Sequence, residues 1–157
     1  MQKADALLDR ATTEIPNALG ASGAAIYERR DEHYALAACS GALGPPQLIP
    51  PDDLAFVRLR KDLSQVDLAE VGSALGSDGI AFALAVRGQL FGALVCGRRT
   101  DGETYAPDEL GMLRKVVHEV GAELQAIRDR ERTDLLNAVV MGTIDLETAR
   151  SQLAAIG

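Results

Sequence analysis

The sequence predicts a single α+β domain, because segments with helical periodicity flank two pairs of short apolar runs. Apolar side chains recur three or four residues apart over residues 3–19 and again from residue 107 to about residue 128, which is the spacing of amphipathic helices. The short apolar runs between these segments are bounded by turn-forming residues, as expected for strands. The chain has 157 residues, of which 47% are hydrophobic, and this is enough for one domain with a buried core.

The charge and the cysteine content exclude several classes of protein. The net charge is −7, with acidic and basic residues interspersed, which argues against a nucleic-acid or membrane partner. No apolar run approaches the roughly 20 residues of a membrane span, and the charged N-terminus is unlike a secretory signal. We therefore expect a cytoplasmic protein. Two distant cysteines, Cys39 and Cys96, indicate neither a disulfide framework nor a metal half-site.

The first part of the chain is expected to form one helix and two strands. The helix over residues 3–19 contains Pro16, which we expect to kink it or to break its last turn. Apolar runs at residues 23–27 and 34–39 predict two strands, joined by an exposed charged loop at residues 28–32.

Residues 41–51 contain too many glycines and prolines for regular secondary structure. It is expected to end at a short helix that runs from Pro51 to about Arg60. Proline suits the first position of a helix, and Asp52 and Asp53 would then lie in the first turn, where the helix dipole favours anions.

The apolar runs on either side of Gly88 and Gln89 predict a β-hairpin, because a glycine in the first position of a two-residue turn suits type II′. In the register that this turn gives, bulky side chains such as Phe82 and Leu84 share one face. The other face carries small side chains, and Cys96 lies among them. A face of small residues on a central strand is typical of close approach by a helix or a ligand.

A long helix is expected to begin at Pro107, a residue that suits the first helical position. Its apolar residues alternate spacings of three and four as far as Ile127, so they form a narrow stripe that can pack on the sheet and on a partner. Residues 128–134 predict a solvated helical linker. A final pair of helices is expected at about residues 135–141 and 146–156, separated by a glycine.

The sequence lacks the residue sets that are typical of enzymes. Cys96 has no basic neighbour on its strand, so it is predicted to be buried and unreactive. His33 and His118 have no Cys or carboxylate at ligand spacing, so no metal site is predicted. The glycines match neither the dinucleotide-binding nor the P-loop spacing. These observations favour a binding or interaction module and assign no cofactor. The expected exposure of Cys39 leaves a small redox enzyme as the alternative.

The order of the predicted elements resembles that of GAF domains. The most specific match runs from residue 82 to residue 124: an apolar strand, a short turn, a second strand with an internal glycine, and then a helix start. In that family the helix start is Tyr/Phe-Ser/Thr-Pro followed by two acidic residues and Leu. Here it is Tyr-Ala-Pro-Asp-Glu-Leu at residues 105–110, with alanine in place of the usual cap. "GASGAAIY" at residues 20–27 resembles the first strand, and residues 50–70 resemble the middle helix and the strand after it.

The resemblance implies an antiparallel sheet of five or six strands, with the N- and C-terminal helices on one face and the short helix and loops over the other. It also implies a sensory or regulatory module, often a homodimer through its terminal helices, with a small-molecule pocket beneath the irregular middle. We prefer the hairpin face with Phe82 and Leu84 for the pocket, although these bulky groups could instead fill it. The implied ligand-binding residues are Cys39, Ser40, Leu54, Val57, Arg58, Phe82 and Leu84.

We divide the chain into a GAF-like domain, residues 1–131, and a C-terminal helical extension or linker, residues 132–157. The extension resembles the linker that follows the GAF domain in some bacterial transcription regulators. The chain is then either a fragment of a longer protein with an output domain or carries a tail that contacts a partner. The family's cyclic-nucleotide, bilin and sulfoxide-reductase motifs are missing, so ligand and output stay open. A purely structural dimerisation module with a filled pocket is a further alternative.

Overall fold

The computed structural model describes residues 3–41, 43–142 and 145–156. Six strands form one sheet in the order β3-β2-β1-β6-β5-β4, and every neighbouring pair is antiparallel. None of the described helices is long and apolar enough to cross a membrane. The elements are α1 (Lys3–Leu19), β1 (Gly23–Arg30), β2 (His33–Gly41), β3 (Leu48–Ile49), α2 (Leu54–Asp62), β4 (Gln65–Asp67), the 3₁₀ helix η1 (Leu68–Glu70), β5 (Ile80–Val86), β6 (Gln89–Cys96), α3 (Pro107–Val140) and α4 (Leu146–Ile156).

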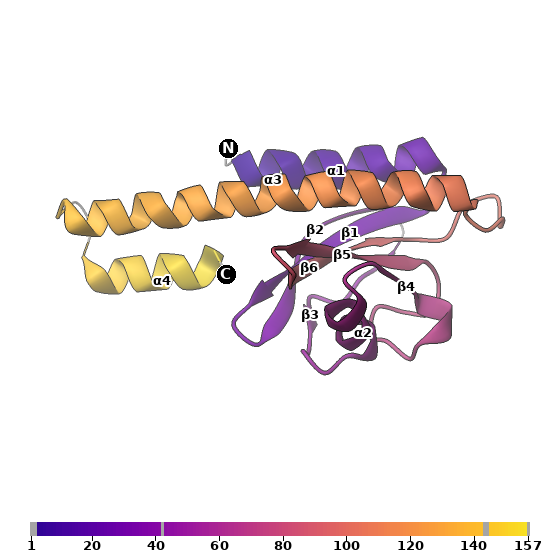
Figure 1. Cartoon of the computed structure of the whole chain (residues 1–157), viewed down its shortest axis with the longest axis horizontal. Helices are drawn as coiled ribbons and strands as arrows, with labels where there is room; N and C mark the ends of the chain where they lie inside the picture. The colour runs from indigo at the N-terminus through magenta and orange to yellow at the C-terminus, as the bar shows by residue number, and fades with distance from the viewer. Residues whose placement is uncertain (1–2, 42, 143–144, 157) are drawn as a thin grey trace.

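Helices cover both faces of the sheet. The two long helices α1 and α3 lie side by side over one face, while α2 lies on the opposite side (Figure 1). Each face has its own cluster of buried apolar side chains, so the molecule has three layers. This arrangement confirms the α+β class and the predicted distribution of the helices. Helix α1 continues past Pro16 to Leu19, so the proline does not end it.

Helix α2 begins three residues later than the sequence analysis placed it. Asp53 is its N-cap, because the Asp53 carboxylate accepts a hydrogen bond from the backbone N–H of Ala55 at 3.1 Å. The same carboxylate accepts hydrogen bonds from the Ser73 hydroxyl and from the backbone N–H of Ala74, both at 2.8 Å. Asp53 therefore starts the helix and also ties the loop before β5 to it.

The hairpin β5–β6 has a different register from the predicted one. Its two turn residues are Arg87 and Gly88, with φ values of 55° and 76°, which is typical of a type I′ turn and not of the expected type II′. Leu84 pairs with Gly92, but the neighbouring residue Ala85 pairs with Leu90. Phe91 is therefore left unpaired, as the extra residue of a β-bulge. A shift of one residue moves each side chain to the opposite face of the sheet.

Gly92 lies where strand β6 meets its neighbour β1. A Cβ atom at this position would lie 2.0 Å from the carbonyl oxygen of Tyr27, so only glycine allows the two strands to approach this closely. The neighbour that requires the small residue is thus a strand, and not a helix or a ligand as the sequence suggested.

Helix α3 is a continuous helix of 34 residues that extends well beyond the sheet (Figure 1). It runs without interruption through the predicted linker at residues 128–134 and across the predicted domain boundary after residue 131. Gly142, with a φ of 76°, follows its end. Helix α4 then returns alongside α3, and the carboxylate of Asp145 caps it by accepting a hydrogen bond from the N–H of Thr148 at 2.7 Å.

Candidate functional site

Two of the residues predicted to bind a ligand, Phe82 and Leu84, lie on the face of the sheet that α1 and α3 cover. Both are fully buried in the core cluster formed with those helices. A Cβ atom at Gly121 of α3 would lie 3.5 Å from Leu84 Cδ2, so the helix packs closely on this strand. The preference for this face as the pocket side rested on the expectation that helices would pack on the face of small residues, whereas α1 and α3 pack on the face with Phe82 and Leu84.

Three more of the predicted residues, Leu54, Val57 and Arg58, project from the outer surface of α2. Leu54 is 55% exposed and Val57 is 41% exposed. The side of α2 that faces the sheet instead carries Phe56 and Leu59, and both are fully buried. Their spacing of three residues is the sequence signal for a buried helix face, and it was available in the sequence.

The last two predicted residues are neighbours on β2 and therefore point to opposite faces of the sheet. The Ser40 hydroxyl donates a hydrogen bond to the backbone carbonyl of Thr12 in α1. Cys39 pairs with Ala25 of β1, and its thiol is exposed. The predicted set is thus divided between both faces of the sheet and the outside of α2, and ligand binding by any of its members stays a prediction.

Cys96 is a packing residue of the helix-covered face. It is fully buried, and its burial raises the pKa of the thiol to about 12. A thiol with so high a pKa stays protonated at neutral pH and is a poor nucleophile. The prediction that Cys96 is buried is confirmed.

An aromatic cluster fills the space between α2 and the sheet. The rings of Tyr34 and Phe56 are stacked with centroids 4.0 Å apart, and the ring of Tyr27 meets Phe56 edge-on at 6.2 Å. All three side chains are buried, and the Tyr27 hydroxyl donates a hydrogen bond to the carbonyl of Pro46 at 2.6 Å. Burial, together with the nearby Cys39, raises the pKa of Tyr27 to about 12. These aromatic side chains lie where the family resemblance implied a ligand pocket.

A buried ion pair joins the sheet to α3. The Arg128 guanidinium donates from Nε to Glu28 Oε1 at 3.0 Å and from Nη2 to Glu28 Oε2 at 2.7 Å. The Glu28 side chain is 4% exposed and that of Arg128 is 12% exposed. The hydrogen bonds to Glu28 outweigh the effect of burial and raise the pKa of Arg128, so the guanidinium stays charged. Glu28 was expected in an exposed loop, but it belongs to β1.

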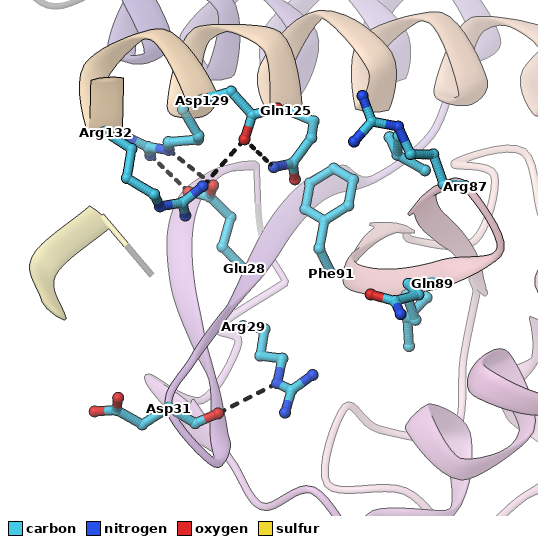
Figure 2. A pocket seen from close by; sticks show the side chains of 12 residues that line it. Glu28, Arg29, Asp31, Arg87, Gln89, Phe91, Gln125, Asp129 and Arg132 are labelled. Carbon is cyan, nitrogen blue, oxygen red and sulfur yellow. Dashed lines mark hydrogen bonds and ion pairs between the residues drawn. The ribbon is translucent and has the colours of Figure 1, made fainter. Parts of the chain in front are cut away.

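A groove of about 560 Å³ lies beside this ion pair (Figure 2). It opens where the turns of the β1–β2 and β5–β6 hairpins meet the middle of α3. No local sequence pattern predicts this groove, because its lining comes from three distant segments. The side chains that matter for its chemistry are those of Arg29, Arg87, Phe91, Gln125, Asp129 and Arg132.

The strand order, with α2 on one face and the terminal helices on the other, defines the GAF fold. The chain is similar to the structure of a GAF/HD-domain protein from Geobacter sulfurreducens, with a TM-score of 0.67 at 15% identity over 81% of this chain and 95% of that chain. It is also similar to the GAF-B domain of DevS from Mycobacterium smegmatis, with a TM-score of 0.66 at 17% identity over 83% and 99% of the two chains.

A third similar structure is the GAF domain of a phosphoenolpyruvate-protein phosphotransferase from Coxiella burnetii, with a TM-score of 0.65 at 16% identity over 82% and 86% of the two chains. No protein-family model matches the sequence, and no curated protein matches it either. The chain therefore has the fold of GAF domains.

Proposed function

We propose that this chain is a cytoplasmic sensory or regulatory module of the GAF type that acts as a homodimer through its terminal helices. The observation that carries the proposal is the distribution of exposed apolar side chains. Among the described residues, six of the nine large hydrophobic side chains that are exposed lie between residues 112 and 146, on α3, on α4 and at the turn between them. Exposed apolar residues that gather in this way are typical of an interaction surface.

Four of these side chains form what we name the distal apolar patch, at the end of the helical hairpin α3–α4. Val140 is 82% exposed and Met141 is 77% exposed, although large apolar side chains are usually buried. A second copy of the chain supplies the same patch and can bury it symmetrically. The distal apolar patch consists of Leu136, Val140, Met141 and Leu146.

Helix α3 connects the sheet to the distal apolar patch in one rigid element. The ion pair between Glu28 and Arg128 fixes this helix to β1, so a shift of the strand would displace the helix. Helix shifts of about 1–2 Å at a subunit interface are a general form of allosteric transition. In this proposal the output is a partner protein or a further domain, controlled by the geometry of the dimer.

The aromatic cluster beneath α2 bears on the alternative of a purely structural dimerisation module. A filled space on that side fits both a spacer and a sensor whose ligand binds elsewhere. The two differ in one measurable respect: ligand binding changes the dimer affinity of a sensor, whereas a spacer has no ligand to respond to.

Substitution of the distal apolar patch should dissociate the dimer. We expect the Leu136→Asp/Val140→Asp variant to have the 16.6 kDa mass of one chain by light scattering, since each buried aspartate would face an apolar surface. The matched control is Leu48→Asp/Leu54→Asp, which changes two leucines that are 62% and 55% exposed away from α3. The control should keep twice that mass. Equal masses for the two variants would contradict this interface.

A second candidate function is a small redox enzyme that uses the exposed thiol of Cys39. It predicts that the protein reduces a peroxide or a sulfoxide in the presence of a thiol reductant, and that Cys39→Ser abolishes the activity. Full activity in the variant, or none in the unaltered protein, would eliminate this candidate.

A further inference from the structure

We propose that the groove between the two hairpin turns and α3 binds a small organic anion that carries a planar ring. Its walls come from β1, β5, β6, their turns and α3, so the site lies apart from the aromatic cluster beneath α2. A volume of about 560 Å³ is within the range of pockets for small organic ligands. The proposal does not rest on the dimer, because one chain supplies all of these walls.

The floor of the groove offers an aromatic surface. Phe91 is the extra residue of the β-bulge, and this irregularity turns its ring toward the helix-covered side of the sheet. The ring is only partly buried, and it lines the groove together with Gln125 of α3 and Arg87 of the β5–β6 turn (Figure 2). A partly exposed phenyl ring in the lining of a groove can stack with a planar ligand.

The charges around the groove favour an anion. Four of the chain's sixteen Lys and Arg side chains line it, although the chain as a whole has a net charge of −7. Arg128 is paired with Glu28, and Arg132 is paired with Asp129 at 3.0 Å. The remaining two arginines, Arg29 and Arg87, are the groups that would recognise the ligand.

Arg29 and Arg87 form no ion pair with any carboxylate in the described part of the chain. Arg29 uses only its Nε, which donates a hydrogen bond to the backbone carbonyl of Asp31 at 3.2 Å. Their guanidinium groups therefore keep free N–H donors, which suit the paired oxygens of a carboxylate or a phosphate.

Two carboxylates limit how far negative charge can extend along the groove. Asp31 lies at the hairpin end, and Asp129 lies on the α3 wall, where it accepts a hydrogen bond from Gln125 Nε2 at 2.9 Å. Both would repel a long polyanion such as a nucleic-acid strand. The amide of Gln89 adds a neutral donor and acceptor for ring substituents. The arrangement fits one anionic group joined to one ring.

The test is a titration of the ¹⁵N-labelled full chain, followed by amide chemical shifts, with phenyl phosphate, benzoate, inorganic phosphate and benzylamine. Phenyl phosphate or benzoate should shift the amides of Arg87, Gln89 and Phe91 with a Kd of about 1 mM or lower. Inorganic phosphate should bind several-fold more weakly, because it lacks the ring. Benzylamine should leave these amides unchanged. Saturable binding of benzylamine there, or no shift with either aromatic anion at about 10 mM, would overturn the proposal.

Variants of the arginines and of Phe91 distinguish the contribution of charge to ligand binding from that of ring stacking. Arg29→Gln/Arg87→Gln should weaken phenyl phosphate binding by about tenfold or more, since both charge-assisted hydrogen bonds are lost. The matched control, Arg10→Gln/Arg98→Gln, removes two exposed arginines outside the groove and should bind as the unaltered protein does. Phe91→Leu should remove the preference for phenyl phosphate over inorganic phosphate. Equal binding by the two arginine variants would overturn the proposal.

Discussion

Replacement of Phe56 with alanine is expected to lower the free energy of unfolding by about 3–5 kcal/mol, because it removes a fully buried ring from the centre of the aromatic cluster. Urea denaturation measures this change. Leu54→Ala is the matched control on the same helix: its side chain is 55% exposed, so the loss should stay below about 1 kcal/mol. A loss below about 1 kcal/mol for Phe56→Ala would show that the cluster is not tightly packed.

The same variant tests whether the chain's own side chains occupy the family's ligand space. Loss of the Phe56 ring should leave an apolar cavity beside Tyr34 and Leu59. Such cavities bind small apolar molecules such as benzene. We expect benzene to raise the Tm of Phe56→Ala and to leave that of the unaltered protein unchanged. A comparable rise for the unaltered protein would contradict the description of this space as filled.

Replacement of Arg128 with methionine is expected to cost about 2–4 kcal/mol, because it leaves the buried carboxylate of Glu28 without its partner. The expected loss of stability is slightly smaller than for a fully buried pair, because the Arg128 side chain is 12% exposed. The Glu28→Gln/Arg128→Met variant should recover much of the loss, because an amide carries no charge that needs compensation. Denaturation of the single and double variants gives the coupling between the two residues.

The control for this prediction is Arg99→Met. Arg99 pairs with Asp101 and Glu109 at the surface, where solvent screens the charges, so its loss should matter distinctly less than that of Arg128. Additive effects of the Glu28 and Arg128 substitutions would contradict a bidentate buried pair. Additive effects would also contradict the proposal that this ion pair couples movements of the sheet to α3.

The elements of the fold could be predicted from the sequence because their signals are local. Helical spacing and short apolar runs depend on neighbours within a few residues, and they located α1, α4, the two hairpins and the start of α3. They divided the continuous α3 into a helix, a linker at residues 128–134 and a separate helix at about residues 135–141. The hairpin register could not be fixed this way. Either Arg87-Gly88 or Gly88-Gln89 supplies a two-residue turn with glycine. The bulge at Phe91, which depends on the partner strand, then shifts the register by a further residue.

The candidate sites were harder to predict because they join distant residues. Glu28 and Arg128 are 100 positions apart, and no local pattern indicates that they meet. On α2 the structure places two of the predicted residues on the outer side of the helix. Leu54 and Val57 were chosen by their position in the family, whereas the spacing of Phe56 and Leu59 indicated which side of the helix is buried. A resemblance that locates an element does not fix which of its faces binds.

The most direct test of the proposed module is sedimentation equilibrium of the unaltered chain from about 1 to 100 µM, since self-association depends on protomer concentration. The proposal predicts that the mass rises with concentration to twice the 16.6 kDa of one chain, as the distal apolar patches of two copies bury each other. A mass of one chain throughout that range would contradict signalling through a helical homodimer.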